Sequence, residues 1–303
     1  MRKIFDLEGG LPGENERFAS AAHDGQGPAS PNRLPEPAQH GLANYGRIFA
    51  SRRRTMAGDE SAEPAEVSLD EFVADLRAAG VARSVVASPR IPNAVIADAV
   101  RRHPDLFIGL AYLSPYDGMR ASRELERLVR EDNFSGLMVS ALTDVLPASD
   151  RRYYPLYARC VDLGVPVRIY TSMNYATDRP YDIGHPRNLD QVACDFPELT
   201  IIAGLSGWPW ANETTALLRR HPNLYADTAA HRPRYFGTPG SGWETFFHFG
   251  NSILQDKIMI GLSSALMDAP VAELIKEYEA LPLKESVQQK WFYDNAARVF
   301  GTS

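Results

Sequence analysis

Short runs of apolar and β-branched residues alternate along this chain with segments in which apolar residues recur every three or four positions. The first pattern predicts buried strands and the second predicts amphipathic helices. Eight strands are predicted, over residues 3–7, 84–87, 107–112, 136–139, 167–170, 200–203, 224–227 and 257–260. Helices predicted between them include 69–79, 93–102, 123–131, 155–163, 189–196 and 213–220. Eight strands alternating with helices are typical of an α/β protein whose parallel sheet closes into a (β/α)8 or TIM barrel.

The predicted barrel makes residues 1–303 a single domain, because about 250 residues are typical of this fold. Residues 11–67 interrupt the pattern, since Gly and Pro recur there without any sustained period. A stretch of this length inside a domain is usually either functional or disordered. It follows the first strand, at the end of the barrel where active sites lie, so we predict a lid or dimer arm over the pocket. The alternative is a floppy insertion.

Composition and charge narrow the class of partner. A formal charge of −6 and a pI near 5.7 argue against nucleic acid or an anionic membrane, both of which favour a basic surface. The apolar runs are too short for a membrane span of about 18 residues. Cys160 and Cys194 fall in predicted helices and do not indicate a disulfide framework, so we expect a cytoplasmic protein. We expect its partner to be a small-molecule substrate. His103 and His221 precede prolines in connections leading into strands, where we expect them to face solvent.

Five short segments occur in an order that resembles a known family. They are DLEGG at 6–10, VPVRIYT at 165–171, IIAGLSGWPW at 201–210, IMIGLSS at 258–264 and NAARVFG at 295–301. The amidohydrolase-related family has similar segments, especially the branch of aminocarboxymuconate-semialdehyde decarboxylase with its related decarboxylases and hydratases. The resemblance covers residues 1–301 apart from the insertion, and implies the barrel fold and a homodimer.

In the resembled family, four His and one Asp on these segments hold a divalent ion. This chain has Glu8, Gly10, Tyr170, Gly204 and Ser263 at the matching positions. A carboxylate and a phenol do not replace the three protein ligands that a catalytic zinc normally uses. The resemblance therefore implies a member that works without a metal, as pyrone-dicarboxylate lactonases of this group do, and we predict no cofactor.

A relocated metal site is the alternative to a metal-free pocket. It would require His185, His231 and a carboxylate such as Asp227 or Asp268 to converge. The chain has no His-x-His or His-Glu-x-x-His spacing that would support such a site.

The substitutions at the metal positions suggest acid–base catalysis. Glu8 is the candidate general acid or base, unless it is only a partner for an arginine. Arg168 lies two residues before Tyr170 on the same face of a strand, so we expect it to face the barrel interior and bind an anion. That anion would be Glu8, Asp6 or a substrate carboxylate. Tyr170 could donate a hydrogen bond to a developing oxyanion.

Five further residues complete the predicted site. Ser263 is expected to donate a hydrogen bond rather than act as a nucleophile, because no Gly-x-Ser-x-Gly motif surrounds it. His231 is a candidate second acid or base, and His185 a candidate substrate contact; each could equally be structural. Trp208 and Trp210 lie in a loop expected on the catalytic face, where they suggest an aromatic wall for a ring substrate.

The resulting interpretation is a metal-independent hydrolase or lyase. Lactone or amide hydrolysis, decarboxylation and cyclisation of a small carboxylated or aromatic ring compound all fit. The alternative is a catalytically inactive barrel, a pseudoenzyme that binds a ligand or a partner protein.

Overall fold

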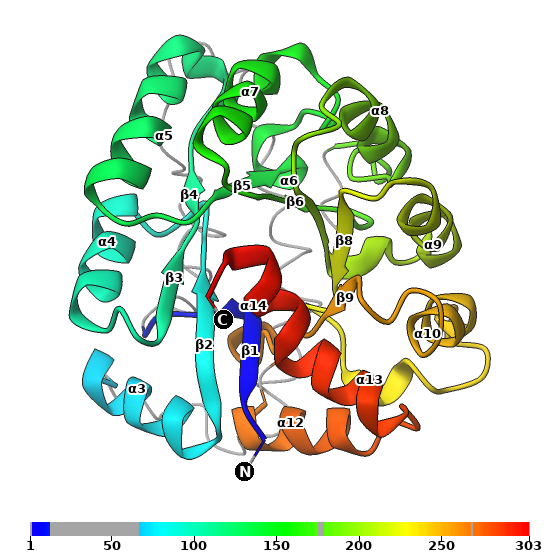
Figure 1. Ribbon diagram of the computed structural model, residues 1–303. Coiled ribbons are helices and arrows are strands. Elements are labelled where there is room, and N and C mark those ends of the chain that lie inside the picture. Colours follow the sequence, from blue (N-terminus) through cyan, green and yellow to red (C-terminus); the bar gives the residue numbers. More distant parts are fainter. Residues whose placement is uncertain (1, 13–66, 175–178, 268, 303) are drawn as a thin grey trace.

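The computed structural model describes residues 2–12, 67–174, 179–267 and 269–302 (Figure 1). Its strands are β1 (Ile4–Gly9), β2 (Val81–Val86), β3 (Phe107–Gly109), β4 (Ala111–Tyr112), β5 (Leu137–Ser140), β6 (Val167–Tyr170), β7 (Ile201–Gly204), β8 (Leu224–Asp227) and β9 (Ile258–Met259). All eight predicted strands are present, and the predicted strand 107–112 is divided at Leu110 into β3 and β4. Residues 13–66, most of the predicted lid or dimer arm, lie outside the described residues, as do residues 175–178 and Asp268.

The strands form a closed parallel barrel. They pair in sequence order, as β1-β2-β3 and as β4 through β9, and every pair is parallel. Leu110 links the two sets, since its N–H donates to the Val86 carbonyl from between β3 and β4. The circle closes where the Leu7 N–H donates to the Ile260 carbonyl at 3.0 Å. The predicted (β/α)8 fold is confirmed.

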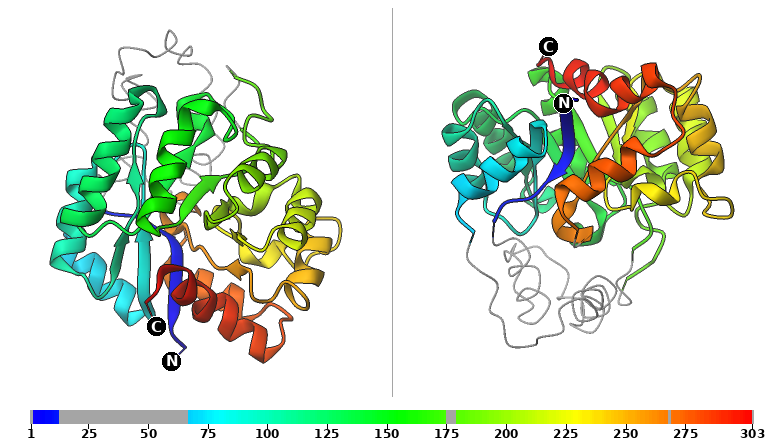
Figure 2. Two further views of the ribbon diagram at one scale, coloured as in Figure 1. Left: turned by 45° about the horizontal axis from the view of Figure 1, so that its top comes forward. Right: turned by 90° about the horizontal axis from the view of Figure 1, so that it is seen from below.

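Helices surround the barrel in Figures 1 and 2. They are α3 (Leu69–Ala78), α4 (Asn93–Arg102), α5 (Met119–Glu131), α6 (Ala141–Asp144), α7 (Tyr154–Leu163), α8 (Arg187–Asp195), α9 (Ala211–Arg220), α10 (Glu244–Gly250), α11 (Ser264–Met267), α12 (Val271–Glu279), α13 (Glu285–Gln289) and α14 (Asn295–Phe300). Each of the six predicted helices is found, with its ends shifted by a few residues at most. Within the part of the chain that the structure describes, no helix is long and apolar enough to cross a membrane.

Local chemistry explains why these elements form where they do. Helix α3 begins at a capping box, in which the Ser68 side chain accepts from the Glu71 N–H and Glu71 bonds back to Ser68. Its apolar residues Val73 and Leu76 are buried against the barrel.

Helix α14 covers one end of the barrel (Figure 1), where Phe300 stacks on Phe5 of β1 at 5.7 Å between ring centroids. That end is closed by α14, and active sites of such barrels lie at the opposite end, where the strands terminate.

The alternation of side chains along the strands separates two apolar cores. An inner core fills the barrel with Phe5, Leu7, Val85, Ala87, Ile108, Leu110, Met138, Ile202 and Met259, closed off by Ala296 and Ala297 of α14. An outer core packs the opposite strand faces against the helices. On β6, Val167 and Ile169 belong to the outer core. Arg168 and Tyr170 therefore face inward, as the sequence pattern predicts.

Candidate active site

Strand β1 is irregular at the point where it delivers Glu8 to the site. Phe5 and Leu7 face the inner core, so a regular strand would turn Glu8 outward. The register with β2 shifts between Asp6 and Gly9, and bulges of this kind often re-aim side chains near active sites. Asp6 Oδ1 accepts the Glu8 N–H at 3.0 Å and the Leu262 N–H at 2.7 Å, and so holds the irregular segment against the chain after β9.

Asp6 itself is a buried acid. Burial raises its pKa to about 7, and the adjacent Glu8 carboxylate acts in the same direction. The two backbone hydrogen bonds and the Arg168 charge lower the pKa by less than burial raises it.

Arg168 lies at the centre of a charged cluster inside the barrel. Its Nε donates to Asp227 Oδ2 at 2.7 Å, and its Nη2 donates to Asp227 Oδ1 at 3.1 Å and to Glu8 Oε2 at 2.5 Å. The side chain is 1% exposed, and the two carboxylates hold the pKa of the guanidinium well above its usual value despite burial. Arg168 is therefore a permanent positive charge with a fixed orientation.

Glu8 and Tyr170 form the less buried side of this cluster. The Tyr170 hydroxyl donates to Glu8 Oε1 at 3.0 Å, and the Tyr170 ring lies against the guanidinium with 4.9 Å from Arg168 Cζ to the ring centroid. The Glu8 side chain is 18% exposed, whereas the Asp227 side chain is fully buried. A proton could therefore reach Glu8 from a bound substrate, while Asp227 is covered.

Asp227 is the main residue of this site that the sequence analysis did not assign. The expected anions for Arg168 were Glu8, Asp6 or a substrate, and Asp6 makes no hydrogen bond to it among the contacts described. Asp227 ends β8, and its Oδ1 also accepts the Leu205 N–H and the Ala229 N–H, each at 3.1 Å. The available signal was its place at the end of a predicted strand, the position that carries catalytic side chains in barrels.

Gly204 lies where the surrounding atoms leave little room for a side chain. A Cβ at this position would lie 3.2 Å from Tyr170 Cδ1, 3.3 Å from the Ile169 carbonyl oxygen and 3.4 Å from Arg168 Nε. The absence of a side chain therefore allows the Arg168 and Tyr170 side chains to sit where they do.

Ser263 lies next to the site, and its hydroxyl oxygen accepts a hydrogen bond from the backbone. Its backbone N–H donates to the Glu8 carbonyl at 3.0 Å, and its Oγ accepts the Ala230 N–H at 2.8 Å. Ser263 and Ala230 have φ angles of 49° and 62°, in the left-handed region. This bond joins the ends of β8 and β9 in a strained segment.

His231 connects to the charged cluster through the backbone. Its Nε2 lies 3.2 Å from the Leu205 carbonyl oxygen, to which it donates, and the Leu205 N–H bonds to Asp227. The imidazole is partly exposed by area, yet Trp243 encloses it at 4.8 Å and Trp208 lies at 6.2 Å between ring centroids. Burial lowers the pKa of His231 to about 4, so the ring is neutral near pH 7.

His185 and Trp210 form a second group. Their rings lie 4.4 Å apart, and Tyr181 packs on the same indole at 5.7 Å. His185 Nδ1 accepts the Arg187 N–H at the start of α8, and burial lowers the pKa of this imidazole. No contact between this pair and Glu8 is described, so the structure brings Glu8, Arg168 and Tyr170 together and leaves His185 and Trp210 apart from them.

The donor set at the family's metal position does not fit a divalent cation. Glu8 binds Arg168 and Tyr170 through its two oxygens, and Ser263 Oγ accepts a backbone N–H. Gly10 and Gly204 offer no side chain, and a fixed guanidinium charge repels a second cation. A relocated site from His185, His231 and Asp227 is not formed, because the one group of three converging ligand atoms among the described residues lies elsewhere, and the alternative carboxylate Asp268 lies outside the described residues.

The fold is a (β/α)8 barrel, and the charged cluster lies towards the carboxyl ends of its strands. The sequence model described as amidohydrolase matches residues 50–302. The chain belongs to the amidohydrolase family. No curated protein matches its sequence.

Solved structures share the fold over nearly their whole length. An uncharacterised TIM-barrel protein from Bordetella bronchiseptica is 27% identical, with a TM-score of 0.68 over 89% of this chain and 97% of that one. A 5-carboxyvanillate decarboxylase from Novosphingobium aromaticivorans, solved with manganese and a nitrobenzoic acid, is 16% identical, with a TM-score of 0.65 over 99% and 96%. The 2,6-dihydroxybenzoate decarboxylase from Rhizobium is 16% identical, with a TM-score of 0.65 over 99% of each chain.

Proposed function

We propose that this protein is a metal-independent lyase or hydrolase, in which Glu8 transfers the proton and Arg168 supplies the positive charge. The observation that carries the proposal is the Arg168 cluster. A guanidinium held by Glu8 and Asp227, with Tyr170 against it, lies among the positions where the family places its metal ligands. A preorganised charge at a reacting centre can stabilise a transition state without reorganising.

The substrate we propose is a small ring compound that carries a carboxylate or an enolisable oxygen. The Arg168 side chain is 1% exposed, so we assign its guanidinium an electrostatic role towards the substrate anion rather than a direct contact. Tyr170 would turn its hydroxyl from Glu8 towards the developing oxyanion. The cluster of two carboxylates and one guanidinium carries a net charge of −1, so an anionic substrate would be accepted more readily when a proton resides on Glu8.

The roles of the remaining residues follow from their positions. Trp208 and His231 would form one aromatic wall of the pocket, with the neutral imidazole able to accept a proton, and His185 with Trp210 would form another. Ser263 Oγ would hold the Ala230 segment, and its O–H would donate to the developing oxyanion. The solved relatives act on 5-carboxyvanillate and 2,6-dihydroxybenzoate, so carboxylated phenols are the first substrate class to test.

A substrate panel tests this proposal. Chelator-treated protein with its metal content measured would be incubated with carboxylated phenols, aromatic amides and aromatic lactones, and product formation followed by chromatography. We expect turnover of at least one class, a loss of turnover in Glu8→Gln and a smaller loss in Tyr170→Phe, which deletes one hydroxyl. Restoration of activity only by added manganese or zinc would refute metal independence.

The binding-protein alternative gives a different result. A pseudoenzyme would bind ring carboxylates by calorimetry without converting any of them, and Glu8→Gln would retain that binding.

We further propose that the chain works as a cytoplasmic homodimer, with residues 11–67 as a lid or dimer arm. The support is the resemblance to the family and the aperiodic insertion after β1. Light scattering of the full chain and of a variant with the insertion replaced by a short linker would show whether the dimer depends on it.

A further inference from the structure

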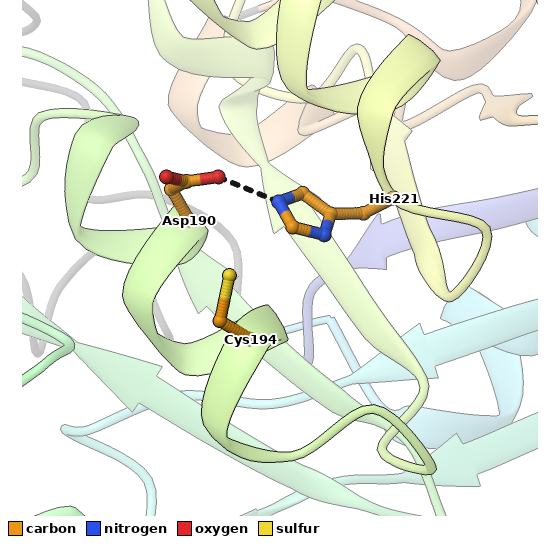
Figure 3. A group of neighbouring side chains, drawn as sticks. All are labelled: Asp190, Cys194 and His221. Atoms are coloured by element: carbon orange, nitrogen blue, oxygen red, sulfur yellow. Dashed lines mark hydrogen bonds and ion pairs between the residues drawn. The ribbon is translucent and has the colours of Figure 1, made fainter.

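Three potential metal ligands converge at a place separate from the charged cluster around Arg168. Asp190 and Cys194 lie four residues apart on α8, which places them on one face of the helix. His221 follows α9 and leads into β8 (Figure 3). Since α9 precedes β8, His221 lies by the amino end of that strand, whereas Asp227 lies at its carboxyl end. The cluster therefore belongs to the opposite end of the barrel from the proposed active site.

We propose that Asp190, Cys194 and His221 form a binding site for a divalent transition-metal ion of the zinc class. One ligand atom from each residue lies within 4.8 Å of the others. A carboxylate oxygen, a thiolate sulfur and an imidazole nitrogen are all established zinc donors, and the sulfur disfavours magnesium and calcium. With the thiol deprotonated, two negative ligands and a neutral imidazole balance the charge of a divalent ion.

The backbones that carry these ligands are held in place. The His221 side chain is buried. The backbone N–H of His221 donates to the Leu217 carbonyl at 2.9 Å, and the backbone carbonyl of His221 accepts a hydrogen bond from Lys257 Nζ. Asn223 ties the same connection to the chain just after α8, because its Nδ2 donates to the Leu199 carbonyl at 2.9 Å. The finding corrects the expectation that His221 faces solvent.

In the present structure, His221 and Asp190 are joined by a hydrogen bond, which a bound metal ion would replace. His221 Nε2 lies 2.6 Å from Asp190 Oδ1 (Figure 3). Two ligand atoms at zinc distances and tetrahedral angles are about 3.3 Å apart, so the pair must open by less than 1 Å. Cys194 is exposed, so its side chain has room to rotate, and water can fill a fourth coordination position. Arg220 opposes the ion, since its Nε lies 3.3 Å from Asp190 Oδ1, but its side chain is 63% exposed and can move into solvent.

The two cysteines make a selective test possible. The chain has only Cys160 and Cys194. Cys160 is buried in α7, and burial raises the pKa of its thiol far above the usual range. A thiol reagent on the native protein therefore titrates Cys194, and Cys160 serves as an internal control.

The experiment is a cobalt titration of the full-length native protein, followed by the thiolate-to-cobalt charge-transfer band in the near ultraviolet. We expect saturation at one ion per chain, with matching protection of Cys194 from the thiol reagent. Cys194→Ser should abolish the band. Asp190→Asn and His221→Gln should each weaken cobalt binding by at least about tenfold, because each removes or neutralises one ligand.

Three results would overturn the proposal. The first is the absence of a band up to about 1 mM cobalt, a concentration at which any affinity is very weak. The second is a band that persists in Cys194→Ser, and the third is a band that neither Asp190→Asn nor His221→Gln affects, which would indicate binding to a lone thiol. Since His221 is buried, circular dichroism must show that His221→Gln folds, and the partly exposed Asp190 gives a second variant if it does not. Cys194 lies outside the proposed catalytic residues, so this test is independent of the proposed reaction.

Discussion

We expect the wild-type protein to lose stability as the pH rises to neutrality, because Asp6 then loses its proton. Replacing Asp6 with asparagine should prevent this loss. Both backbone hydrogen bonds to this side chain end on the same atom, Oδ1, so the carbonyl oxygen of an amide can accept both. The variant therefore keeps the β1 irregularity that orients Glu8. What it removes is the ability to carry a buried negative charge.

The sign and size of the effect follow from the pKa of Asp6. Burial raises it from 3.8 to about 7 in the folded state. The folded protein binds this proton more tightly than the unfolded chain, so the stabilisation is complete below pH 3.8 and is lost as the pH rises through 7. Each pH unit in that window costs 1.36 kcal/mol, so between about pH 5 and pH 7 the loss is about 3 kcal/mol.

The measurement is the free energy of unfolding in urea at about pH 5 and about pH 8, for wild type and Asp6→Asn. Fluorescence and circular dichroism transitions must coincide for the value to be meaningful. Asp75→Asn is the matched control, because Asp75 is exposed on α3 and its replacement removes the same charge. Asp6→Asn should gain about 3 kcal/mol relative to wild type between the two pH values, and the control none. A relative stability that stays constant within about 0.5 kcal/mol, or falls, would refute the buried-acid assignment.

Four further changes test the site and its surroundings. Glu8→Gln should lower kcat at least about a hundredfold in the substrate assay, since it deletes the general acid or base. Arg168→Met leaves two carboxylates without their cation and should lower the free energy of unfolding by about 3–5 kcal/mol in urea; an unchanged value would contradict the charge balance described. Gly204→Ala should displace the ring of Tyr170 and reduce turnover by about tenfold to a hundredfold with little change in secondary structure, whereas unaltered kinetics would show that the site tolerates the added methyl. Elemental analysis after zinc loading should find one ion per chain in wild type and none in Cys194→Ser, with identical activity.

The fold could be predicted from the sequence because periodicity and segment order report it directly. The strand predicted over residues 167–170 is β6 with the same bounds, and helix α4 matches its predicted range. Inward orientation was also predictable for Arg168 and Tyr170, because side chains two residues apart on a strand share a face. These features depend only on local chemistry and burial.

The pairing of the inward residues could not be predicted in the same way. Alternation indicates that Arg168 faces inward but not which carboxylate meets it, and Asp227 lies 59 residues further along. Glu8 presents the opposite problem, since regular alternation from Leu7 would have turned it outward and the register shift of β1 is visible only in the paired strands. His221 was misplaced because the proline after it indicated a connection, while its bond to Asp190 of another helix left no trace in the local sequence.

In the metal-independent reaction that we propose, Arg168 takes the place of a metal ion, and this constrains the chemistry that the barrel can perform. A guanidinium offers charge and directed hydrogen bonds, but it has no vacant coordination position that could lower the pKa of a water molecule. Protons must therefore pass through protein side chains, and Glu8 is the member of the charged cluster that is both ionisable and partly exposed. Because the two carboxylates hold the pKa of Arg168 well above its usual value, this residue adds no pH dependence of its own to turnover. Reactions that need an electrophilic anchor and one proton transfer, such as decarboxylation of an electron-rich ring acid, fit this constraint better than hydrolysis of an unactivated amide.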